Sequence, residues 1–448
     1  MKPLAPFRPA DWLALLLVLA GAVGARVGYV LLTTAEGEGV PLWQVQGEGP
    51  TRGGRTEFTA LVEELRAEGR FAARAPLSDD VESTAHVSPG YPWLAALLIR
   101  LGNDALLRWF QCALGAGAAA LLFLFARRVF RSLAAATLAG LLVALHPFGI
   151  VNVAERADGV VASFLVAAAL FLGARGSQTG GPFTSLLYGA TLAGMALVRA
   201  PFLPFALAGL VWFLVACRGL RQGWLPALLA FLGLANGLAP WLVRNVKEFN
   251  EPLPVVSSTW LHLYVGNNAR TTGGPLDEAE LRASLPADRL SALLREKNQA
   301  RRYDMLADEV RRDPGAFFER RLQTGAAFIL GDTWLRERRL ALGRPRDDGL
   351  AAPPWLDDAV PAALAASLLL MAALGLWGWR RSLAWGGAAG LLTLAAVLLP
   401  LPYLLGHAGS LAGPRLPVDG VWLTYAALAL SGIRAPGPGA AEKDPEAT

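Results

Sequence analysis

The sequence predicts an all-α polytopic membrane protein with about ten transmembrane helices. Of its 448 residues, 54% are hydrophobic and only 17% are charged, which is little charge for a soluble protein of this length. The apolar residues also gather in runs of about 20, the length that an α-helix needs to cross the hydrocarbon core. These runs lie near residues 11–33, 106–126, 132–151, 158–175, 184–199, 202–217, 223–243, 360–379, 384–405 and 417–433.

Basic residues in the short turns predict the orientation of these helices. In a ten-helix arrangement they all fall on one side of the membrane, together with both ends of the chain. By the positive-inside rule, that side faces the cytoplasm. The residues are Lys2, Arg8, Arg127, Arg128, Arg131, Arg218, Arg221, Arg380 and Arg381.

The predicted transmembrane domain covers residues 11–433, and two long segments project from its outer side. Residues 34–105 form a first outer loop with surface helices. Residues 246–359 form an outer domain, which we expect to be mainly helical because opposite charges recur at i, i+4 spacing. Residues 434–448 are rich in Pro, Gly and charge, which predicts a disordered cytoplasmic tail.

Several classes of function have no support in the sequence. The sequence pI of 9.5 is explained by arginines at helix ends, so it does not indicate a nucleic-acid partner. There is no Walker loop, no G-x-G-x-x-G and no H-E-x-x-H motif. Cys112 and Cys217 lack metal-ligand spacing. No cofactor is therefore predicted with certainty, and a divalent metal remains possible.

Four arginines occupy the outer ends of the predicted helices, against the positive-inside bias. They are Arg26, Arg199, Arg244 and Arg415. Each one alone could snorkel to lipid phosphates. Together they favour an anionic ligand at that depth, because the planar guanidinium group binds two phosphate oxygens at once.

Carboxylates on the same side are candidates for a general base. Glu57 lies in "GGRTEFTALVEELRAEGRF", an amphipathic stretch expected on the membrane surface. Asp158 lies in the tight turn between the third and fourth helices. Either carboxylate could take a proton from a hydroxyl group, and either could instead belong to a solvated charged face.

Short motifs in this order resemble those of the GT-C class of polytopic glycosyltransferases. The resemblance runs over roughly residues 11–433 and is strongest to the bacterial family related to protein O-mannosyltransferases and lipid A aminoarabinose transferases. The motifs are "RVGY" (26–29), "SPGYP" (88–92), "FARRVF" (125–130), "LHPFGIV" (145–151), "LVRAPF" (197–202), "PWLVRN" (240–245), "LYVGNN" (263–268) and "RLP" (415–417).

The resemblance implies an inverting hexosyl or pentosyl transfer on the outer face of the bacterial cytoplasmic membrane. The donor would be a sugar on a polyprenyl phosphate, and the acceptor a glycan, lipid or protein hydroxyl in the cell envelope. Glu57 and Asp158 would be the catalytic carboxylates. The donor phosphate and sugar would be bound by Arg26, Arg199, Arg244, Asn245, Asn267, Asn268, His407 and Arg415.

One departure from the family pattern keeps a second hypothesis open. The family carries an aspartate early in the first outer loop, where this chain has Gly54, and Phe58 replaces a tyrosine. Glu57 could replace that aspartate as the base. Alternatively, the chain is a catalytically altered relative that binds lipid-linked sugar or supports a partner enzyme. A transporter is disfavoured, because neither midplane charges nor inverted repeats are evident.

Overall fold

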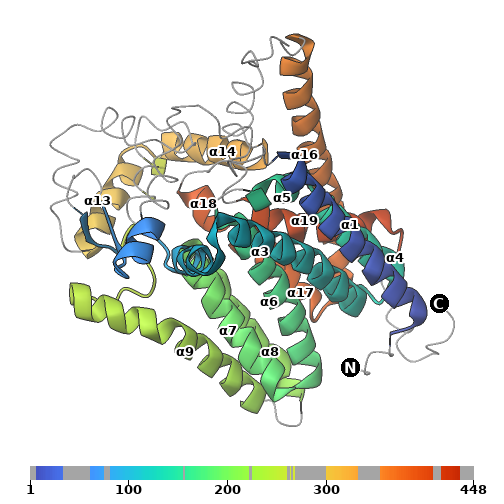
Figure 1. The fold of residues 1–448 in the computed structure, drawn as a ribbon, viewed down its shortest axis with the longest axis horizontal. Helices are drawn as coiled ribbons and strands as arrows, with labels where there is room; N and C mark the ends of the chain where they lie inside the picture. Colours follow the sequence, from blue (N-terminus) through green and yellow to red (C-terminus); the bar gives the residue numbers. More distant parts are fainter. Residues whose placement is uncertain are drawn as a thin grey trace.

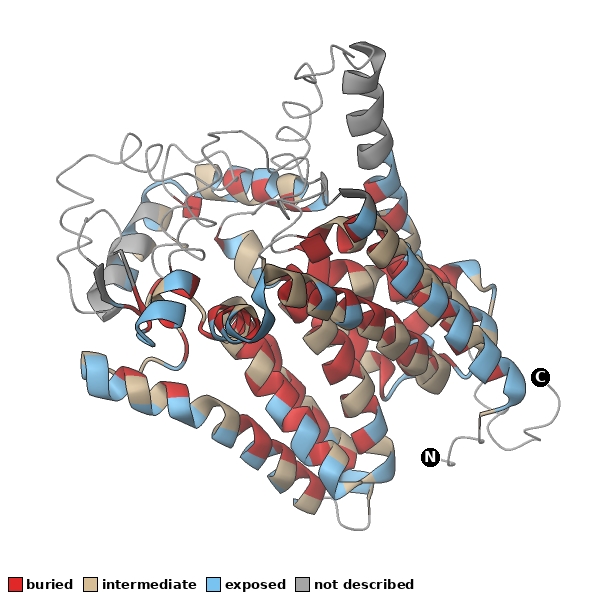
Figure 2. Ribbon diagram, viewed as in Figure 1, coloured by how far each residue is buried: buried red, intermediate tan, exposed pale blue. Residues whose placement is uncertain are grey.

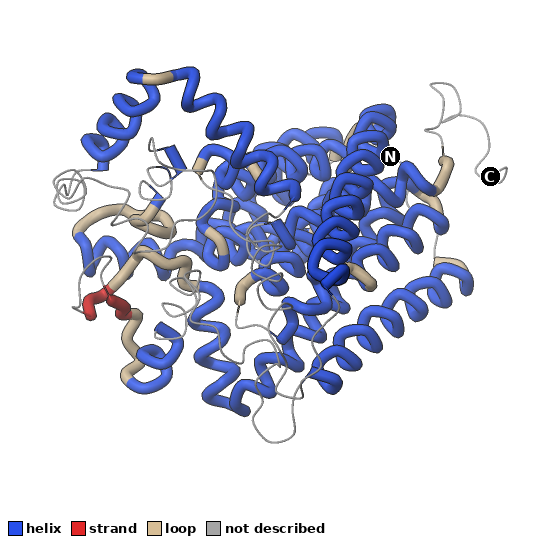
Figure 3. Tube along the Cα trace, turned by 90° about the horizontal axis from the view of Figure 1, so that it is seen from above, coloured by secondary structure: helices blue, strands red, loops and turns tan. Residues whose placement is uncertain are grey.

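The computed structural model describes residues 7–33, 61–74, 81–154, 157–220, 224–259, 263, 266–267, 299–330, 354–406 and 415–433. This part of the chain is almost entirely helical, which confirms the all-α prediction (Figures 1 and 3). The helices are α1 (Pro9–Thr33), α3 (Gly90–Phe130), α4 (Leu133–Ala144), α5 (Pro147–Val151), α6 (Gly159–Thr179), α7 (Pro182–Val198), α8 (Leu203–Ala216), α9 (Trp224–Phe249), α13 (Gln299–Arg312), α14 (Pro314–Leu330), α16 (Pro354–Ser382), α17 (Ala389–Leu398), α18 (Leu401–Leu405) and α19 (Leu416–Leu430).

Each of the ten predicted apolar runs coincides with helical structure, although the number of spans remains a prediction. Five of the described helices are long and apolar enough to cross a membrane, or six if α4 and α5, bent by 52°, form one span. Three shorter apolar segments cover Pro182–Val198, Ala389–Leu405 and Leu416–Leu430. The chain is thus a multi-pass membrane protein, and large apolar side chains such as Leu13, Phe183 and Trp224 are exposed where lipid would contact them.

The first outer loop contributes a helix break and a small hairpin. Residues 90–102 form a helical segment that is too short to span the membrane. In α3 this segment is set apart from the long helix that follows, because Gly102 and Asn103 leave the helical conformation. Upstream, β1 (Ala72–Arg74) pairs antiparallel with β2 (Val81–Ser83).

The amphipathic stretch of the first loop is helical over residues 61–67, and its apolar side faces the protein. Leu61, Val62 and Leu65 are buried, while Glu63 is exposed. The stretch is therefore helical in line with its amphipathic periodicity, but its apolar residues pack within the protein, and its expected position on the membrane surface stays a prediction. Glu57, which precedes it, lies outside the described residues.

The centre of the bundle is formed by α4, α6, α7 and α19, whereas α1 and α9 expose their outer faces (Figure 2). Small residues allow close helix packing, as is common in membranes. A Cβ atom at Gly189 of α7 would overlap the Ala230 carbonyl of α9, and one at Gly378 of α16 would overlap the Tyr425 carbonyl of α19. Such contacts fix how the helices that carry the site lie against one another.

Two sets of contacts distinguish the ends of the bundle. At one end, Arg127 near the end of α3 donates to Asp11 at the start of α1, with an Nε to Oδ1 distance of 2.6 Å. At the same end, Arg381 of α16 donates to the Ala429 carbonyl near the end of α19, at 3.0 Å. The helices α13 and α14, which belong to the segment 246–359, lie at the opposite end (Figure 1). The short turns predicted to be cytoplasmic therefore lie away from α14.

Candidate functional site

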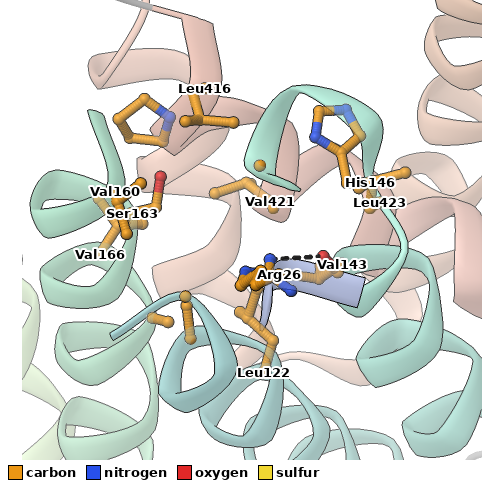
Figure 4. Close-up of a pocket in the computed structure, with 16 residues that line it drawn as sticks. Arg26, Leu122, Val143, His146, Val160, Ser163, Val166, Leu416, Val421 and Leu423 are labelled. Carbon is orange, nitrogen blue, oxygen red and sulfur yellow. Dashed lines mark hydrogen bonds between the residues drawn. The ribbon is translucent and has the colours of Figure 1, made fainter. Parts of the chain in front are cut away.

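A pocket opens between α1, α3, α4, α6 and α19, and its walls are mostly apolar (Figure 4). The cavity itself is small, about 40 Å³, and it opens into a space of about 480 Å³ that includes solvent outside the protein. Leu122, Val143, Val160, Val166 and Val421 are among the lining residues. The polar side chains on its surface are few: those of Arg26, His146 and Ser163. Its lining is thus apolar with a few polar groups, the composition typical of ligand-binding pockets.

Arg26 is the buried cation of this pocket, with 2% of its surface exposed. Its Nη1 donates to the carbonyls of Ala144 at 2.8 Å and Ala22 at 3.1 Å, and its Nη2 to that of Val143 at 3.4 Å. Ala144 and Val143 end α4, where carbonyls lack helical partners and favour a cation. Its buried Nε has no hydrogen-bond partner.

The chain is shaped to hold this guanidinium group in place. A Cβ atom on Gly115 of α3 would overlap the Arg26 side chain, so a larger residue there would displace it. Among the described residues, no carboxylate pairs with Arg26. Burying a charge without a counter-charge is unfavourable, and the carbonyl dipoles around Arg26 compensate its positive charge only in part.

Arg415, Asp419 and His146 form a second buried group, of which His146 lines the pocket. Arg415 Nε donates to Asp419 Oδ1 at 2.7 Å, one turn along α19. His146, between α4 and α5, places its Nε2 3.6 Å from Asp419 Oδ2. Counting Arg26, this region carries two guanidinium groups against one carboxylate, an excess of one positive charge when His146 is neutral. That excess favours an anionic ligand.

Asp158 and Arg199 form a third group, at the turns before α6 and after α7. Arg199 binds both carboxylate oxygens, with Nε to Oδ2 at 2.7 Å and Nη2 to Oδ1 at 2.6 Å. Tyr403 of α18 lies beside Arg199, and its ring stacks on Phe328 of α14 at a centroid distance of 6.2 Å. The Phe328 carbonyl accepts from Arg415 Nη1 at 3.4 Å. These shared neighbours connect the second and third groups.

Arg244 and Asn245 have other partners. Arg244 Nη1 donates to the Thr84 carbonyl at 2.8 Å and Nη2 to the Phe71 carbonyl at 3.2 Å, and the guanidinium carbon lies 4.8 Å from the Trp241 ring. Asn245 Nδ2 donates to the Leu253 carbonyl at 3.0 Å. These bonds attach α9 to the first outer loop and to the segment after α9. The structure thus connects Arg26, Arg199 and Arg415 and leaves Arg244 apart from them.

Gly266 and Asn267 pack on the C-terminal end of α18. Asn267 Nδ2 donates to the carbonyls of Leu263 at 2.7 Å and Leu405 at 2.9 Å. Arg321 of α14 donates to the carbonyls of Gly266, Leu404 and Gly406. Burial and the neighbouring charge of Arg320 lower the pKa of Arg321 to about 10, so it remains charged at neutral pH. The side chains of Glu57, Asn268 and His407 lie outside the described residues.

Sequence reasoning missed His146, Asp419 and Tyr403. Asp419 could have been found, because it follows Arg415 by four residues, the spacing at which helical side chains pair. His146 stood within the motif "LHPFGIV", but no local pattern indicates that it meets α19. Tyr403 was one aromatic residue among many in an apolar run.

Metal binding has no support in the described ranges. In them, no three His, Cys, Asp or Glu side chains come together in a way that could hold a metal ion.

Comparisons with known proteins agree with the fold. Residues 86–243 match the family model of dolichyl-phosphate-mannose-protein mannosyltransferases. The whole fold is similar to the apo form of the oligosaccharyltransferase of Archaeoglobus fulgidus, with a TM-score of 0.52 and 17% identity. That similarity covers 94% of this chain but only 50% of the other, so this chain spans about half the length of that structure. No curated protein matches the chain.

The chain therefore has the fold of the GT-C class of glycosyltransferases, as its motifs suggested. Within that class, the segment from α3 to α9 is similar to the mannosyltransferase family named above. This segment contains His146, Asp158 and Arg199 and ends one residue before Arg244.

Proposed function

We propose that this protein transfers a sugar from a polyprenyl-phosphate donor to an acceptor hydroxyl on the outer face of the membrane. One observation carries the proposal: Arg26, buried and without a carboxylate partner in the described residues, lies in an apolar pocket. A lipid phosphate has matching chemistry, because its isoprenoid chain suits apolar walls and its phosphate suits a guanidinium group.

The reaction follows from these groups. The acceptor oxygen forms a bond to the anomeric carbon while the bond from that carbon to the phosphate oxygen breaks. The leaving polyprenyl phosphate takes the bonding electrons, and attack opposite to it inverts the anomeric configuration. Arg26 and Arg415 stabilise the charge that grows on the phosphate. The proton of the acceptor hydroxyl goes to a carboxylate, for which Glu57 is the candidate.

The contacts of Asp158 assign it a different task from Glu57. Both of its oxygens accept hydrogen bonds from Arg199, so the pair carries no net charge and Asp158 is poorly available as a base. We assign Asp158 as a positioning residue. It would hold Arg199 so that Nη1, which is buried and has no hydrogen-bond partner, can bind the donor.

Transfer from a labelled polyprenyl-phosphate sugar tests the proposal. In Arg26→Gln, we expect donor affinity to fall by about 10- to 100-fold, which corresponds to losing one charged hydrogen bond. Arg218→Gln is the matched control, because Arg218 is exposed in the turn after α8, at the end of the bundle away from Arg26. Equal donor affinity in Arg26→Gln and in Arg218→Gln would contradict the proposal.

A second candidate is a relative that binds lipid-linked sugar without transferring it. Two observations favour it: Gly54 stands where the family carries an aspartate, and Asp158 is occupied by Arg199. This candidate predicts the same loss of donor binding in Arg26→Gln. It differs in predicting no turnover in the unaltered protein with any acceptor.

A further inference from the structure

Arg320 of α14 is a buried cation that the proposed donor site does not use. Only 8% of its surface is exposed, and the buried Nε has no hydrogen-bond partner. It lies on the buried face of α14 with Thr324 and Phe328, whereas Phe318 and Leu322 on the opposite face are exposed. Among the described residues, Arg320 makes no hydrogen bond or ion pair through its side chain. An unpaired buried charge is unfavourable unless a ligand compensates it.

Asn267 has a hydrogen-bond acceptor without a donor, and it lies where the segment 266–267 contacts α14 and α18. Its Nδ2 donates to two carbonyl oxygens, which fixes the orientation of the amide. The buried Oδ1 is then left without a donor. Arg321, the neighbour of Arg320, binds the carbonyls of Gly266 and Gly406 on either side of this turn. Asn267 Oδ1, an acceptor without a donor in the described residues, therefore lies close to α14, the helix that carries Arg320.

These two groups are separate from the region around Arg415. Phe328, whose carbonyl binds Arg415, follows Arg320 by eight residues. Eight residues correspond to about 12 Å along a helix. Arg320 thus lies about two turns of α14 away from the residue that contacts Arg415, which favours a second anionic group at Arg320 over one phosphate shared by both arginines.

We propose that Arg320 and Asn267 bind the acceptor, and that the acceptor is an acidic sugar or glycan. Arg320 would bind its carboxylate or phosphate, and Asn267 Oδ1 would accept a hydrogen bond from one of its hydroxyl groups. This inference rests on the proposed function, because only a transferase has an acceptor substrate. The binding site itself can be tested without a donor and without turnover.

The experiment measures binding of glucuronate, glucose 1-phosphate and neutral glucose to the full-length protein in detergent. We expect both acids to bind more tightly than glucose, and Arg320→Gln to weaken both by about 10-fold or more. Arg311→Gln, on exposed surface where Arg311 pairs with Asp308, is the control and should bind as the unaltered protein does. Saturating polyprenyl phosphate should leave the binding of both acids unchanged.

Stability separates a ligand-binding role from a structural one. Arg320→Gln should unfold at the same temperature as the unaltered protein or at a higher one, because it removes an unpaired buried charge. If that variant does not fold, Arg320→Lys should still bind both acids more weakly, since an ammonium group lacks the guanidinium fork.

Three results would overturn the proposal. The first is unchanged acid binding in Arg320→Gln or, where that variant does not fold, in Arg320→Lys. The second is a clear fall in unfolding temperature in Arg320→Gln with acid binding intact, which would make Arg320 a structural residue. The third is displacement of the acids by polyprenyl phosphate, which would assign this anion site to the donor.

Discussion

Arginines lie at both ends of the helix bundle, but those at one end are more deeply buried than those at the other. At the end with the short turns, Arg127 pairs with Asp11, Arg381 binds the carbonyl of Ala429, and Arg218 is exposed. At the other end, Arg26, Arg199 and Arg415 are buried. A hydropathy profile assigns both sets to helix ends, yet only burial distinguishes arginines that set orientation from arginines that can hold a ligand.

The charge balance sharpens this contrast. Arg127 has a carboxylate partner within 2.6 Å, so its charge is compensated within the chain. Arg26 has only carbonyl oxygens as partners in the described residues, and its Nε has none. The end of the bundle that holds Arg26 thus carries positive charge that the described chain does not neutralise. This is the expected state of a site prepared for a phosphate.

The largest expected effect concerns the base. Glu57→Gln keeps the size and hydrogen bonding of the side chain but removes the proton acceptor. Transfer should therefore fall by about 10²- to 10⁴-fold while donor binding persists. The measurement is single-turnover transfer of the labelled sugar alongside donor binding. Unchanged transfer would remove this role from Glu57 and direct attention to other carboxylates of the first outer loop, such as Asp79, Asp80 and Glu82.

The next effect concerns the buried ion pair at the outer end. Arg415→Met leaves Asp419, which is 1% exposed, beside a His146 that is 3.6 Å away. An uncompensated buried carboxylate should reduce the free energy of unfolding by about 3–5 kcal/mol. The double variant Arg415→Met/Asp419→Leu removes both charges and should regain most of that loss. Thermal unfolding in detergent measures the difference, and equal loss in the single and double variants would refute the pairing.

The smallest effect is expected at the other end of the bundle. Arg218→Gln changes an exposed side chain in a short turn, so neither donor affinity nor unfolding temperature should change appreciably. A loss of donor binding in this variant as large as that in Arg26→Gln would abolish the distinction between the two ends.

Local patterns in the sequence predicted the helices well. Apolar runs of membrane length coincide with helical structure, and the helix over residues 61–67 follows from its periodicity. The i, i+4 spacing of Arg415 and Asp419 also indicates that they pair. The predicted count of ten spans is untested, because α4 and α5 are bent and α17 and α18 are short.

Contacts between distant segments were beyond local patterns. Arg199 and Asp158 were assigned separate tasks in binding and catalysis, yet they bind each other, because the turns at the ends of α6 and α7 meet. His146 and Asp419 come together only when α19 packs against α4. Arg244 has the expected position at a helix end, but its partners are carbonyls of the first outer loop. Such pairings depend on helix packing, which periodicity does not encode.

The central claim is that the buried arginines of the outer end bind a lipid phosphate, and a ratio of two affinities tests it most directly. The ligands are a polyprenyl phosphate without sugar and the corresponding uncharged polyprenol, which share the apolar chain and differ in charge. The unaltered protein should prefer the phosphate, and Arg26→Gln should lose about 10- to 100-fold of that preference while it binds the polyprenol as before. An equal preference for the phosphate in both proteins would contradict the claim.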